Sequence, residues 1–449
     1  MINSENKSVP SARILAYQAL YDILEKDAYA NLTIQHILRS YDLKEAETHL
    51  LTELVYGVLR RYNYIIWIIS KLSTRPVKKL HPSVRIIICL GLYQLLYLTR
   101  IPESAAVNES VKIAKKVTHR GNASFINAIL RSYLRKKDEI KLIERHQDPI
   151  LHDSLFYSEP EWLIRLFRKS YEEESTFRIL ESFNQTPFMT VRINTHKISI
   201  INLVRKLEEK GINAETVSWK SDALIIRKGA YSIWEFVEKG YVYVQSLSSM
   251  IPADVLCPQK NDKVLDMCAA PGSKTTQMSV FMEDTGSIDA WDLYSHKISL
   301  IKTNAEKLGL SNIRAQVRDS SILHDDSIDY YDRILLDAPC SGLGVLSHKP
   351  EIRWRRTKKD LEEFPQIQRK LLNCAARYLK KGGTLVYSTC TLNPKENEDM
   401  VQLFLSDHKD FRTQDFVIEN LKSSKDGMMT ILPDELESDG FFIARLIKE

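Results

Sequence analysis

The first third of the chain carries apolar residues at the three- and four-residue spacing of a helix face. This pattern runs from Ser11 to Arg145, so we predict an all-helical domain. Its main interruptions are Gly57, Pro76, Pro82 and Pro102. The longest apolar run, 86–98, contains Gln94 and is shorter than the ~20 residues that a membrane-spanning helix needs. We expect this run to form a buried helix.

The pattern changes after about residue 150. A helical stretch at 161–183 and a helix-like segment at 198–210 stand beside strand-like segments at 189–194 and 223–227, which predicts a small α+β unit. From about Gln245, short apolar strands alternate with helical segments. We place these strands at 264–265, 287–291, 313–317, 333–336, 384–387 and 441–446. Such alternation predicts a parallel sheet that is covered on both faces.

With 449 residues and 44% hydrophobic content, the chain can bury more than one core. We predict a multidomain protein with three parts: an all-α N-terminal domain over 1–148, a small α+β connecting domain over 149–244, and an α/β Rossmann-like domain over 245–449. The six cysteines are scattered without metal-binding spacing or disulfide density, so we propose no metal site and expect reduced thiols. Met1 to Lys7 lack a signal core, which favours a soluble, cytoplasmic protein with no membrane association.

Candidate chemistry gathers where the strands of the last domain end. Asp266, Asp292 and Asp319 follow the first three strands, Asp337 and Cys340 follow the fourth, and Cys390 follows the fifth. The carboxyl ends of the strands are where open α/β sheets bind ligands. One acid at a strand end is often only a helix cap or a turn residue. Four acids beside two cysteines instead indicate an enzyme with covalent chemistry.

A turn of small residues, 269–275, lies between the first strand and a helix. It matches neither the P-loop pattern, because Ser273 stands directly before Lys274, nor the Gly-x-Gly-x-x-Gly pattern of dinucleotide sites. Asp292, roughly 20 residues further on, is placed to accept hydrogen bonds from ribose hydroxyls. The turn therefore favours a nucleoside cofactor that carries no phosphate groups.

The net charge of +5 permits nucleic-acid binding without requiring it, so local charge has to decide. Two stretches are basic. Between residues 112 and 137 there is no acid, and the basic residues include Lys112, Lys115, Lys116 and Arg120. The second stretch follows the Asp-Ala-Pro-Cys turn and includes Arg353, Trp354, Arg355 and Arg356. The first stretch is either a solvated helix face or a surface that contacts phosphates. In the second stretch, the candidates are phosphate contact and base stacking on Trp354, and the alternative for Trp354 is ordinary packing of the loop.

Longer motifs surround these residues. They are Asp-Met-Cys-Ala-Ala-Pro-Gly-Ser-Lys-Thr at 266–275, Asp-Ala-Pro-Cys-Ser-Gly-Leu-Gly at 337–344, Ile-Arg-Trp at 352–354, Tyr-Ser-Thr-Cys at 387–390 and Asp-Gly-Phe-Phe at 439–442. Together they resemble the RNA 5-methylcytosine methyltransferases that use S-adenosylmethionine. In the first domain, 53–60, 91–95, 105–109 and 125–131 look like the helical domain related to the antitermination factor NusB. The resemblance therefore covers nearly the whole chain.

The resemblance implies a role for each motif residue. The S-adenosylmethionine pocket would be lined by Cys268, Ala269, Ala270, Pro271, Gly272, Ser273 and Lys274. Asp292 would bind the ribose, Asp319 would lie near the adenine, and Asp337 would border both cofactor and target cytosine. Cys390 matches the family's nucleophile, and Cys340 matches the second cysteine, which assists release of the methylated base. A family-like Arg-x-Asn at Arg192 and Asn194 suggests a role near the RNA.

The implied reaction transfers a methyl group to carbon 5 of a cytosine in 16S ribosomal RNA, by family cytosine 967, in RNA that is unassembled or partly assembled. We expect a monomer. Two alternatives stay open: a transfer RNA substrate, and a non-catalytic RNA-binding protein of the antitermination type. Lys274 is a candidate for activating the attacking thiol. Ser273 replaces a glycine that relatives commonly carry, which would weaken cofactor binding if the turn needs a positive φ at Ser273.

Overall fold

The computed structural model describes residues 10–449, and the chain divides into two compact units. The first comprises the described residues up to Gln185 together with Lys349–Arg355, and the second comprises Thr186–His348 and Arg356–Glu449. The N-terminal stretch Met1 to Lys7, which we expected to lack a secretion signal, lies outside the described residues. The domain boundaries at residues 148 and 244 stay predictions.

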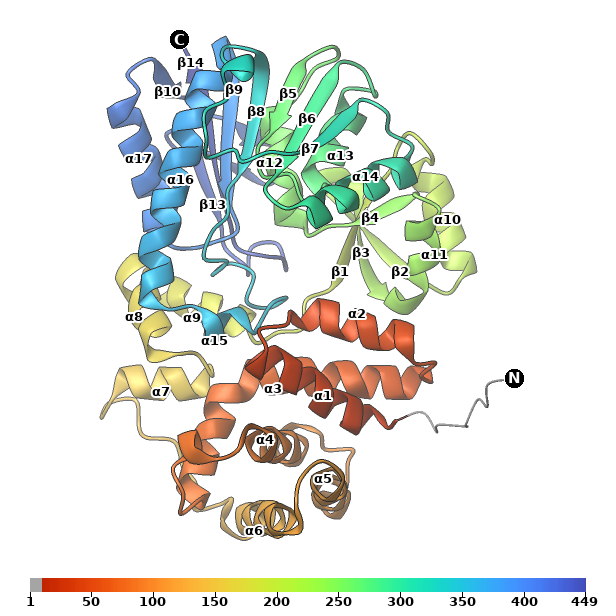
Figure 1. Ribbon diagram of the computed structural model, residues 1–449, viewed down its shortest axis with the longest axis vertical. Helices are drawn as coiled ribbons and strands as arrows, with labels where there is room; N and C mark the ends of the chain where they lie inside the picture. The colour runs from red at the N-terminus through yellow and green to blue at the C-terminus, as the bar shows by residue number, and fades with distance from the viewer. Residues whose placement is uncertain (1–9) are drawn as a thin grey trace. The chain divides into compact units, whose positions relative to one another are not determined.

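Helices make up the regular structure of the first unit (Figure 1). They are α1 (Ala12–Glu25), α2 (Ala30–Ser40), α3 (Glu45–Leu72), α4 (Pro82–Tyr97), α5 (Glu103–Val117), α6 (Arg120–Lys136), α7 (Pro149–Phe156), α8 (Glu161–Ser170), α9 (Glu173–Ser182) and α15 (Ile352–Arg355), with a 3₁₀ turn η1 (Val77–Lys79). The predicted all-helical domain is therefore confirmed.

Helix α4 is the apolar run of the sequence, and it is buried on almost every side. Pro82 stands at its first position, where a missing N–H costs no helical hydrogen bond. Its one strongly polar buried side chain, Gln94, donates from Nε2 to the carbonyl of Leu90 at 2.9 Å. Among residues 10–449, no helix is long and apolar enough to cross a membrane.

The second unit begins with a small antiparallel sheet in the order β2-β3-β1-β4. Its elements are β1 (Met189–Ile193), α10 (Ile200–Glu209), β2 (Asn213–Val217), β3 (Lys220–Lys228), η2 (Ala230–Ile233), α11 (Trp234–Glu238) and β4 (Val242–Val244). Leu203 and Leu207 of α10 pack with Val191 and Leu224 of the sheet in one core. The predicted α+β arrangement is confirmed, although its predicted helical stretch, α8 and α9, belongs to the first unit.

The large sheet of the second unit has the order β10-β14-β9-β8-β5-β6-β7, with β13 paired to β14. Its strands are β5 (Lys263–Asp266), β6 (Ser287–Asp292), β7 (Ile313–Val317), β8 (Tyr331–Asp337), β9 (Leu379–Thr389), β10 (Phe411–Thr413), β13 (Met428–Ile431) and β14 (Phe441–Lys448). A two-stranded sheet, β11 (Val417–Ile418) and β12 (Lys422–Ser423), lies off it.

The five strands from β5 to β9 are parallel, as predicted, whereas β14 pairs with β9 in the antiparallel direction. The predicted parallel sheet is therefore confirmed for β5 to β9, but β14 does not follow it. A parallel neighbour needs a crossover, usually a helix, and no helix separates β13 from β14. The chain instead turns back directly, so β14 runs against both β13 and β9.

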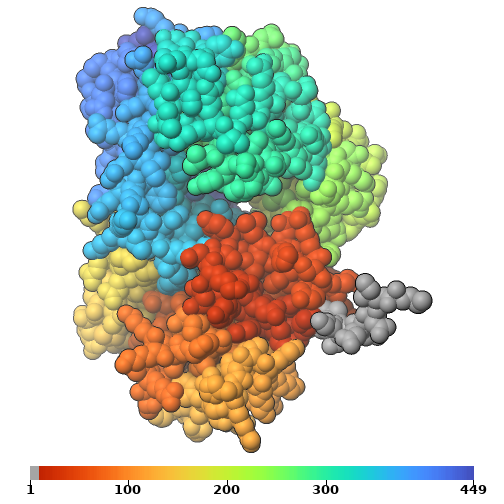
Figure 2. Space-filling model, viewed as in Figure 1, coloured from red at the N-terminus to blue at the C-terminus, as the bar shows by residue number. Residues whose placement is uncertain are grey.

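Helices cover both faces of this sheet (Figure 1). They are α12 (Leu247–Leu256), α13 (Ser273–Phe281), α14 (Ser295–Leu308), α16 (Lys358–Tyr378) and α17 (Glu398–Asp407), with the 3₁₀ turns η3 (Asp325–Ser327) and η4 (Pro394–Glu396). Successive strand side chains point to opposite faces. Leu336 thus packs with α16 and α17, and Leu335 with α12 and α13. The outer surface of α16 and α17 appears in light and darker blue (Figure 2).

Candidate active site

The candidate residues meet at the point in the sheet where the order of strand addition reverses, between β5 and β8. From β5 the chain adds β6 and β7 on one side, and then β8 and β9 on the other. Asp266 and Asp337 end the neighbouring strands β5 and β8, and Cys390 directly follows β9. The crevice outside the carboxyl ends at such a switch point is the usual ligand site of an open α/β sheet.

The two cysteines predicted to act together are neighbours. Sγ of Cys340, in the loop after β8, lies 3.3 Å from Sγ of Cys390. The hydrogen bond with Cys390, reinforced by burial, raises the pKa of the Cys340 thiol well above its ordinary value. The raised pKa favours the protonated form of the Cys340 thiol, and either sulfur can donate in this contact.

The ammonium group of Lys274 lies beside the carboxylate of Asp337. Its Nζ is 2.7 Å from Oδ2 of Asp337 and 3.1 Å from Oγ of Ser249. Ser388 donates to the other carboxylate oxygen, Oδ1, at 2.9 Å. Lys274 is 7% exposed, whereas the side chain of Asp337 is 29% exposed, so water reaches this ion pair mainly from the Asp337 side. The ammonium group therefore fixes the orientation of Asp337, and activation of a thiol by Lys274 stays a prediction.

The cofactor turn places its one positive φ at Gly272, with φ of 100°. Gly272 is the N-cap of α13, and Ser273 is the first residue of that helix. A Cβ at Gly272 would be strained by the φ angle and would lie 3.3 Å from Cα of Ile301. The glycine that the turn requires is therefore present, and the weakening we considered for Ser273 does not arise.

The acids at the next strand ends stand beside exposed apolar side chains. Asp292 is 7% exposed, and its Oδ1 accepts the backbone N–H of Tyr294 at 3.2 Å. Leu293, directly after Asp292, is 52% exposed, and Ile322, three residues after Asp319, is 56% exposed. Carboxylates for ribose hydroxyls beside apolar surface for a purine ring are the groups that a nucleoside needs. The residues present therefore fit S-adenosylmethionine. Sequence analysis missed Leu293 and Ile322, although apolar residues beside strand-end acids were a usable signal.

Asp266 lies beneath this turn, almost without exposure to solvent. Its Oδ2 accepts a hydrogen bond of 2.7 Å from Oγ1 of Thr275 in α13. Burial raises the pKa of Asp266 to about 7, an effect that the Thr275 hydroxyl partly offsets. The folded protein therefore retains a proton on Asp266 at pH values where the unfolded chain has released it.

Because its pKa is raised on folding, Asp266 makes a contribution to the free energy of unfolding that decreases as pH rises. Between about pH 4 and pH 7 the folded state binds more protons at Asp266 than the unfolded state, so the free energy of unfolding decreases with pH. Asp266→Asn mimics the protonated side chain and removes this dependence. We expect the stability of the variant relative to the wild type to increase between pH 5 and pH 8, measured by urea unfolding without cofactor. A constant difference would contradict the assigned shift.

A buried carboxylate not assigned from the sequence supports both cysteine loops. Glu396 accepts the backbone N–H of Ser341 at 2.8 Å and hydrogen bonds from Gln368 and Asn393 at 3.0 and 2.9 Å. It is fully buried. Ser341 follows Cys340 directly, so Glu396 ties this loop to the chain after Cys390. Its role was not predicted from the sequence, because two of these three partners, Ser341 and Gln368, lie 55 and 28 residues away in the chain.

Two residues expected near RNA are interior. Arg192 is 2% exposed and donates to Oε1 of Gln245 at 3.0 Å and to Oγ1 of Thr276 at 2.9 Å. Asn194 is equally buried and donates to the carbonyls of Gly240 and Leu308. The expectation of RNA contact is wrong for both, because their polar groups are used internally. Arg192 instead holds the start of α13 and thereby the cofactor turn.

The second basic stretch is also mostly internal. In the first unit, Arg353 is fully buried beside Glu159, with NH1 2.9 Å from its Oε1. Trp354 donates from Nε1 to the carbonyl of Leu59 at 2.9 Å, and Arg355 donates to the carbonyls of Ile23 and Ala28. These three residues anchor the segment Lys349–Arg355, which corrects our expectation of RNA contact. Arg356, in the second unit, donates to the carbonyl of Ser341 at 2.8 Å and is half-buried.

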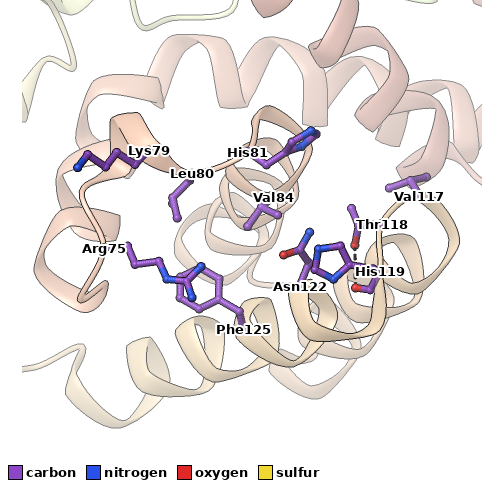
Figure 3. Close-up of a pocket in the computed structure, with 10 residues that line it drawn as sticks. All are labelled: Arg75, Lys79, Leu80, His81, Val84, Val117, Thr118, His119, Asn122 and Phe125. Carbon is purple, nitrogen blue, oxygen red and sulfur yellow. Dashed lines mark hydrogen bonds between the residues drawn. The ribbon is translucent and has the colours of Figure 1, made fainter.

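The first basic stretch is different, because Lys112, Lys115, Lys116 and Arg120 are exposed on α5 and α6. Between these helices and η1 lies a cavity of about 360 Å³ (Figure 3). It is lined by Arg75, Lys79, Leu80, His81, Val84, Val117, Thr118, His119, Asn122 and Phe125. The guanidinium of Arg75 lies 5.6 Å from the ring centre of Phe125. The lining contains no acid.

The fold and the strand-end residues define an α/β methyltransferase domain. A family model described as 16S rRNA methyltransferase RsmB/F matches residues 253–447, a NusB family model matches 10–135, and a model of the RsmF/B-like ferredoxin-like domain matches 159–232. These matches cover both units of the chain.

Relatives of this chain match it over almost their whole length and almost the whole length of this chain. The chain is 37% identical to the probable ribosomal RNA small subunit methyltransferase B of Synechocystis sp., over 98% of this chain and 99% of that protein. It is 36% identical to the probable enzyme of that name from Bacillus subtilis, with the same coverage. The solved structure of PH0851 matches with a TM-score of 0.85 and 25% identity, over 98% of this chain and 99% of that chain. The chain belongs to the ribosomal RNA small subunit methyltransferase B family and is an rRNA methyltransferase.

Proposed function

We propose that this protein transfers a methyl group from S-adenosylmethionine to carbon 5 of a cytosine in 16S rRNA, by family cytosine 967, through a covalent adduct between Cys390 and the base. The observation that carries the proposal is the pair of sulfur atoms 3.3 Å apart beside Asp337. A single cysteine would suit many reactions. Two neighbouring thiols suit one that forms a carbon–sulfur bond and then has to break it.

The cofactor would be held by the turn 268–273 together with Lys274, Asp292, Asp319 and Asp337. Bound there, S-adenosylmethionine supplies an electrophilic methyl group on a sulfonium. Arg192 keeps the turn in place, since it bonds both Thr276 and the carbonyl of Ser273. Asp337, oriented by Lys274 and Ser388, lies between the cofactor turn and the cysteines and would bind the polar edge of the cytosine.

The cysteines divide the reaction between them. Carbon 5 of cytosine is a poor nucleophile, so the thiolate of Cys390 adds to carbon 6 and pushes electron density onto carbon 5, where the methyl group is accepted. This addition removes the negative charge of Cys390. The hydrogen bond and the charge of Cys390 contribute, together with burial, to the raised pKa of Cys340, so this pKa falls once the adduct has formed. Cys340 is then able to take part in removing the carbon 5 proton, after which the Cys390 sulfur leaves.

A stacked base cannot expose carbon 6 to a thiol, so the target cytosine must be unpaired or turned out of its helix. Such RNA is free before ribosome assembly is complete, and we propose unassembled or partly assembled 16S rRNA in the cytoplasm as the substrate, with the enzyme acting as a monomer. The decisive experiment maps 5-methylcytosine in 16S rRNA from cells with and without this protein. Loss of one modified cytosine supports the proposal, and an unchanged map with a lost transfer RNA methylation would favour the transfer RNA alternative.

The acid-free cavity of the first unit suits RNA as well. Arg75, Lys79 and His119 offer positive or hydrogen-bonding groups, and Phe125 offers a ring beside them (Figure 3). Exposed Lys115 and Lys116 continue this charge on α5. Phosphates bind such groups with release of counterions, which makes the affinity salt-dependent. We propose this surface as an RNA contact of the helical domain.

Replacing Arg75 by alanine tests this contact. We expect an affinity for a 16S rRNA fragment that is about tenfold lower, and a slope of log affinity against log salt that is reduced by about 1, since one phosphate contact is lost. Fluorescence anisotropy at several salt concentrations measures both. Arg165→Ala is the matched control, because Arg165 is an exposed arginine of α8 in the same unit but outside the cavity. Equal effects of the two substitutions would contradict a local contact.

A further inference from the structure

The two thiols of the site are distinguished by the contact between their sulfur atoms. Cys340, Cys390 and Cys268 are partly buried, whereas Cys89 and Cys374 are buried and Cys257 is exposed. A disulfide needs sulfur atoms about 2.05 Å apart, so the pair at 3.3 Å needs an approach of only about 1.3 Å. Side-chain rotation can supply part of such a movement.

The surrounding hydrogen bonds hold the backbones of the two loops together. The residues that follow the cysteines, Ser341 and Thr391, have their hydroxyl oxygens 2.7 Å apart. Gly344 donates its N–H to the carbonyl of Cys390 at 3.0 Å. With the bond from Ser341 to Glu396, three contacts fix one loop against the other. The proximity of the thiols is therefore built into the site before any substrate binds.

We propose that Cys340 and Cys390 are an oxidation site, at which a peroxide converts the two thiols into an intramolecular disulfide that a dithiol reduces again. No such modification is needed for methyl transfer. The cross-link itself is independent of the proposed function. Its consequence, reversible loss of methylation, rests on Cys390 being the nucleophile.

The chemistry balances with a peroxide as the oxidant. The Cys390 thiol first releases its proton, and the thiolate attacks a peroxide oxygen. The O–O bond breaks, and the hydroxide that leaves takes up that proton, so a sulfenic acid and one water result. The sulfur of Cys340 then attacks the Cys390 sulfur. The S–S bond forms, the S–O bond breaks, and the hydroxyl leaves as water with the proton of Cys340. Two thiols and hydrogen peroxide thus give one disulfide and two waters.

Cys340 would also protect Cys390 from irreversible damage. A sulfenic acid without a nearby thiol is oxidised further to sulfinic and sulfonic acids, whereas a resolving cysteine captures it as a disulfide. Substrate should compete with this oxidation. A Cys390 sulfur that is bonded to a cytosine has no free thiolate for a peroxide to oxidise.

The test uses the full chain carrying Cys257→Ala, which removes the exposed cysteine outside the site. The protein is treated with hydrogen peroxide and digested with trypsin, and mass spectrometry seeks peptide 334–353, which contains Cys340, joined to peptide 382–395, which contains Cys390. We expect the joined peptides, two hydrogens lighter than their sum, and methylation that falls at least about tenfold and returns with dithiothreitol. Cys340→Ala on the same background should give no joined peptides and overoxidised Cys390.

Two outcomes would overturn the inference: Cys390 overoxidised without joined peptides in the presence of Cys340, or both peptides recovered with free thiols while methylation is lost. The proposed function has a separate readout. Joined peptides from a protein that methylates no RNA before oxidation would leave the oxidation site standing and refute the cytosine chemistry. RNA methylation by the untreated protein, with no joined peptides after oxidation, would support the proposed function and refute the oxidation site.

Discussion

Replacing Cys390 by alanine should abolish methyl transfer and any covalent protein–RNA complex. The substitution removes the sulfur that adds to carbon 6, and removal of a catalytic nucleophile costs at least about 10³-fold in turnover. Transfer of labelled methyl groups to 16S rRNA measures the rate, and denaturing electrophoresis with labelled RNA detects the adduct. Binding of RNA should be retained, because Cys390 contributes no charge to the cavity of the first unit.

Cys257→Ala is the matched control for this prediction. Cys257 is exposed and ends α12, away from the carboxyl ends of the strands. We expect this variant to methylate RNA at the wild-type rate. Methylation by Cys390→Ala at more than about a tenth of the wild-type rate would refute the role of Cys390 as nucleophile.

Replacing Cys340 by alanine should cause the covalent protein–RNA complex to accumulate, whereas Cys390→Ala abolishes it. Attack by Cys390 remains available, but release of the base is slowed because the neighbouring thiol no longer assists it. We expect turnover to fall by about 10²-fold or more, the contribution typical of proton transfer by a positioned side chain, while the covalent complex with RNA accumulates. The complex survives denaturation and migrates as a slower band with labelled RNA.

The double variant, Cys340→Ala with Cys390→Ala, is the control for the adduct. It should form no complex, since the accumulated bond is to Cys390. If Cys340→Ala alone forms no complex while it still binds RNA, its role in release is wrong. A complex that persists in the double variant would place the bond on another residue.

Much of the fold was accessible from the sequence because helix and strand periodicity are local properties. The alternation after Gln245 predicted β5 to β9 and their order of appearance, and motif residues at strand ends were expected to gather because parallel strands end at one edge. The direction of β14 was not accessible. It depends on pairing with β9 and β13, and a single strand's alternation is the same in either direction.

Charge was the poorest guide to the site. Arg353 was predicted to contact RNA as part of a basic stretch, and Arg192 as part of a family-like Arg-x-Asn. Both are instead buried with partners distant in sequence, Glu159 and Gln245. Lys115 and Lys116 carry the same charge and are exposed. An arginine is exposed or buried according to which acceptor groups the fold places beside it. The burial of single polar residues follows no helix or strand periodicity, so it cannot be predicted from the local sequence.

The sequence by itself determined that this protein has a helical domain, a small α+β unit and an α/β domain with acids and two cysteines at its strand ends. Those features follow from periodicity and spacing, which act over a few residues. Only the tertiary structure decided that the two sulfur atoms are 3.3 Å apart, that Lys274 pairs with Asp337, and that Glu396 ties the loops together. These contacts join residues 50 to 63 positions apart, and the register and packing of the folded sheet set their distances.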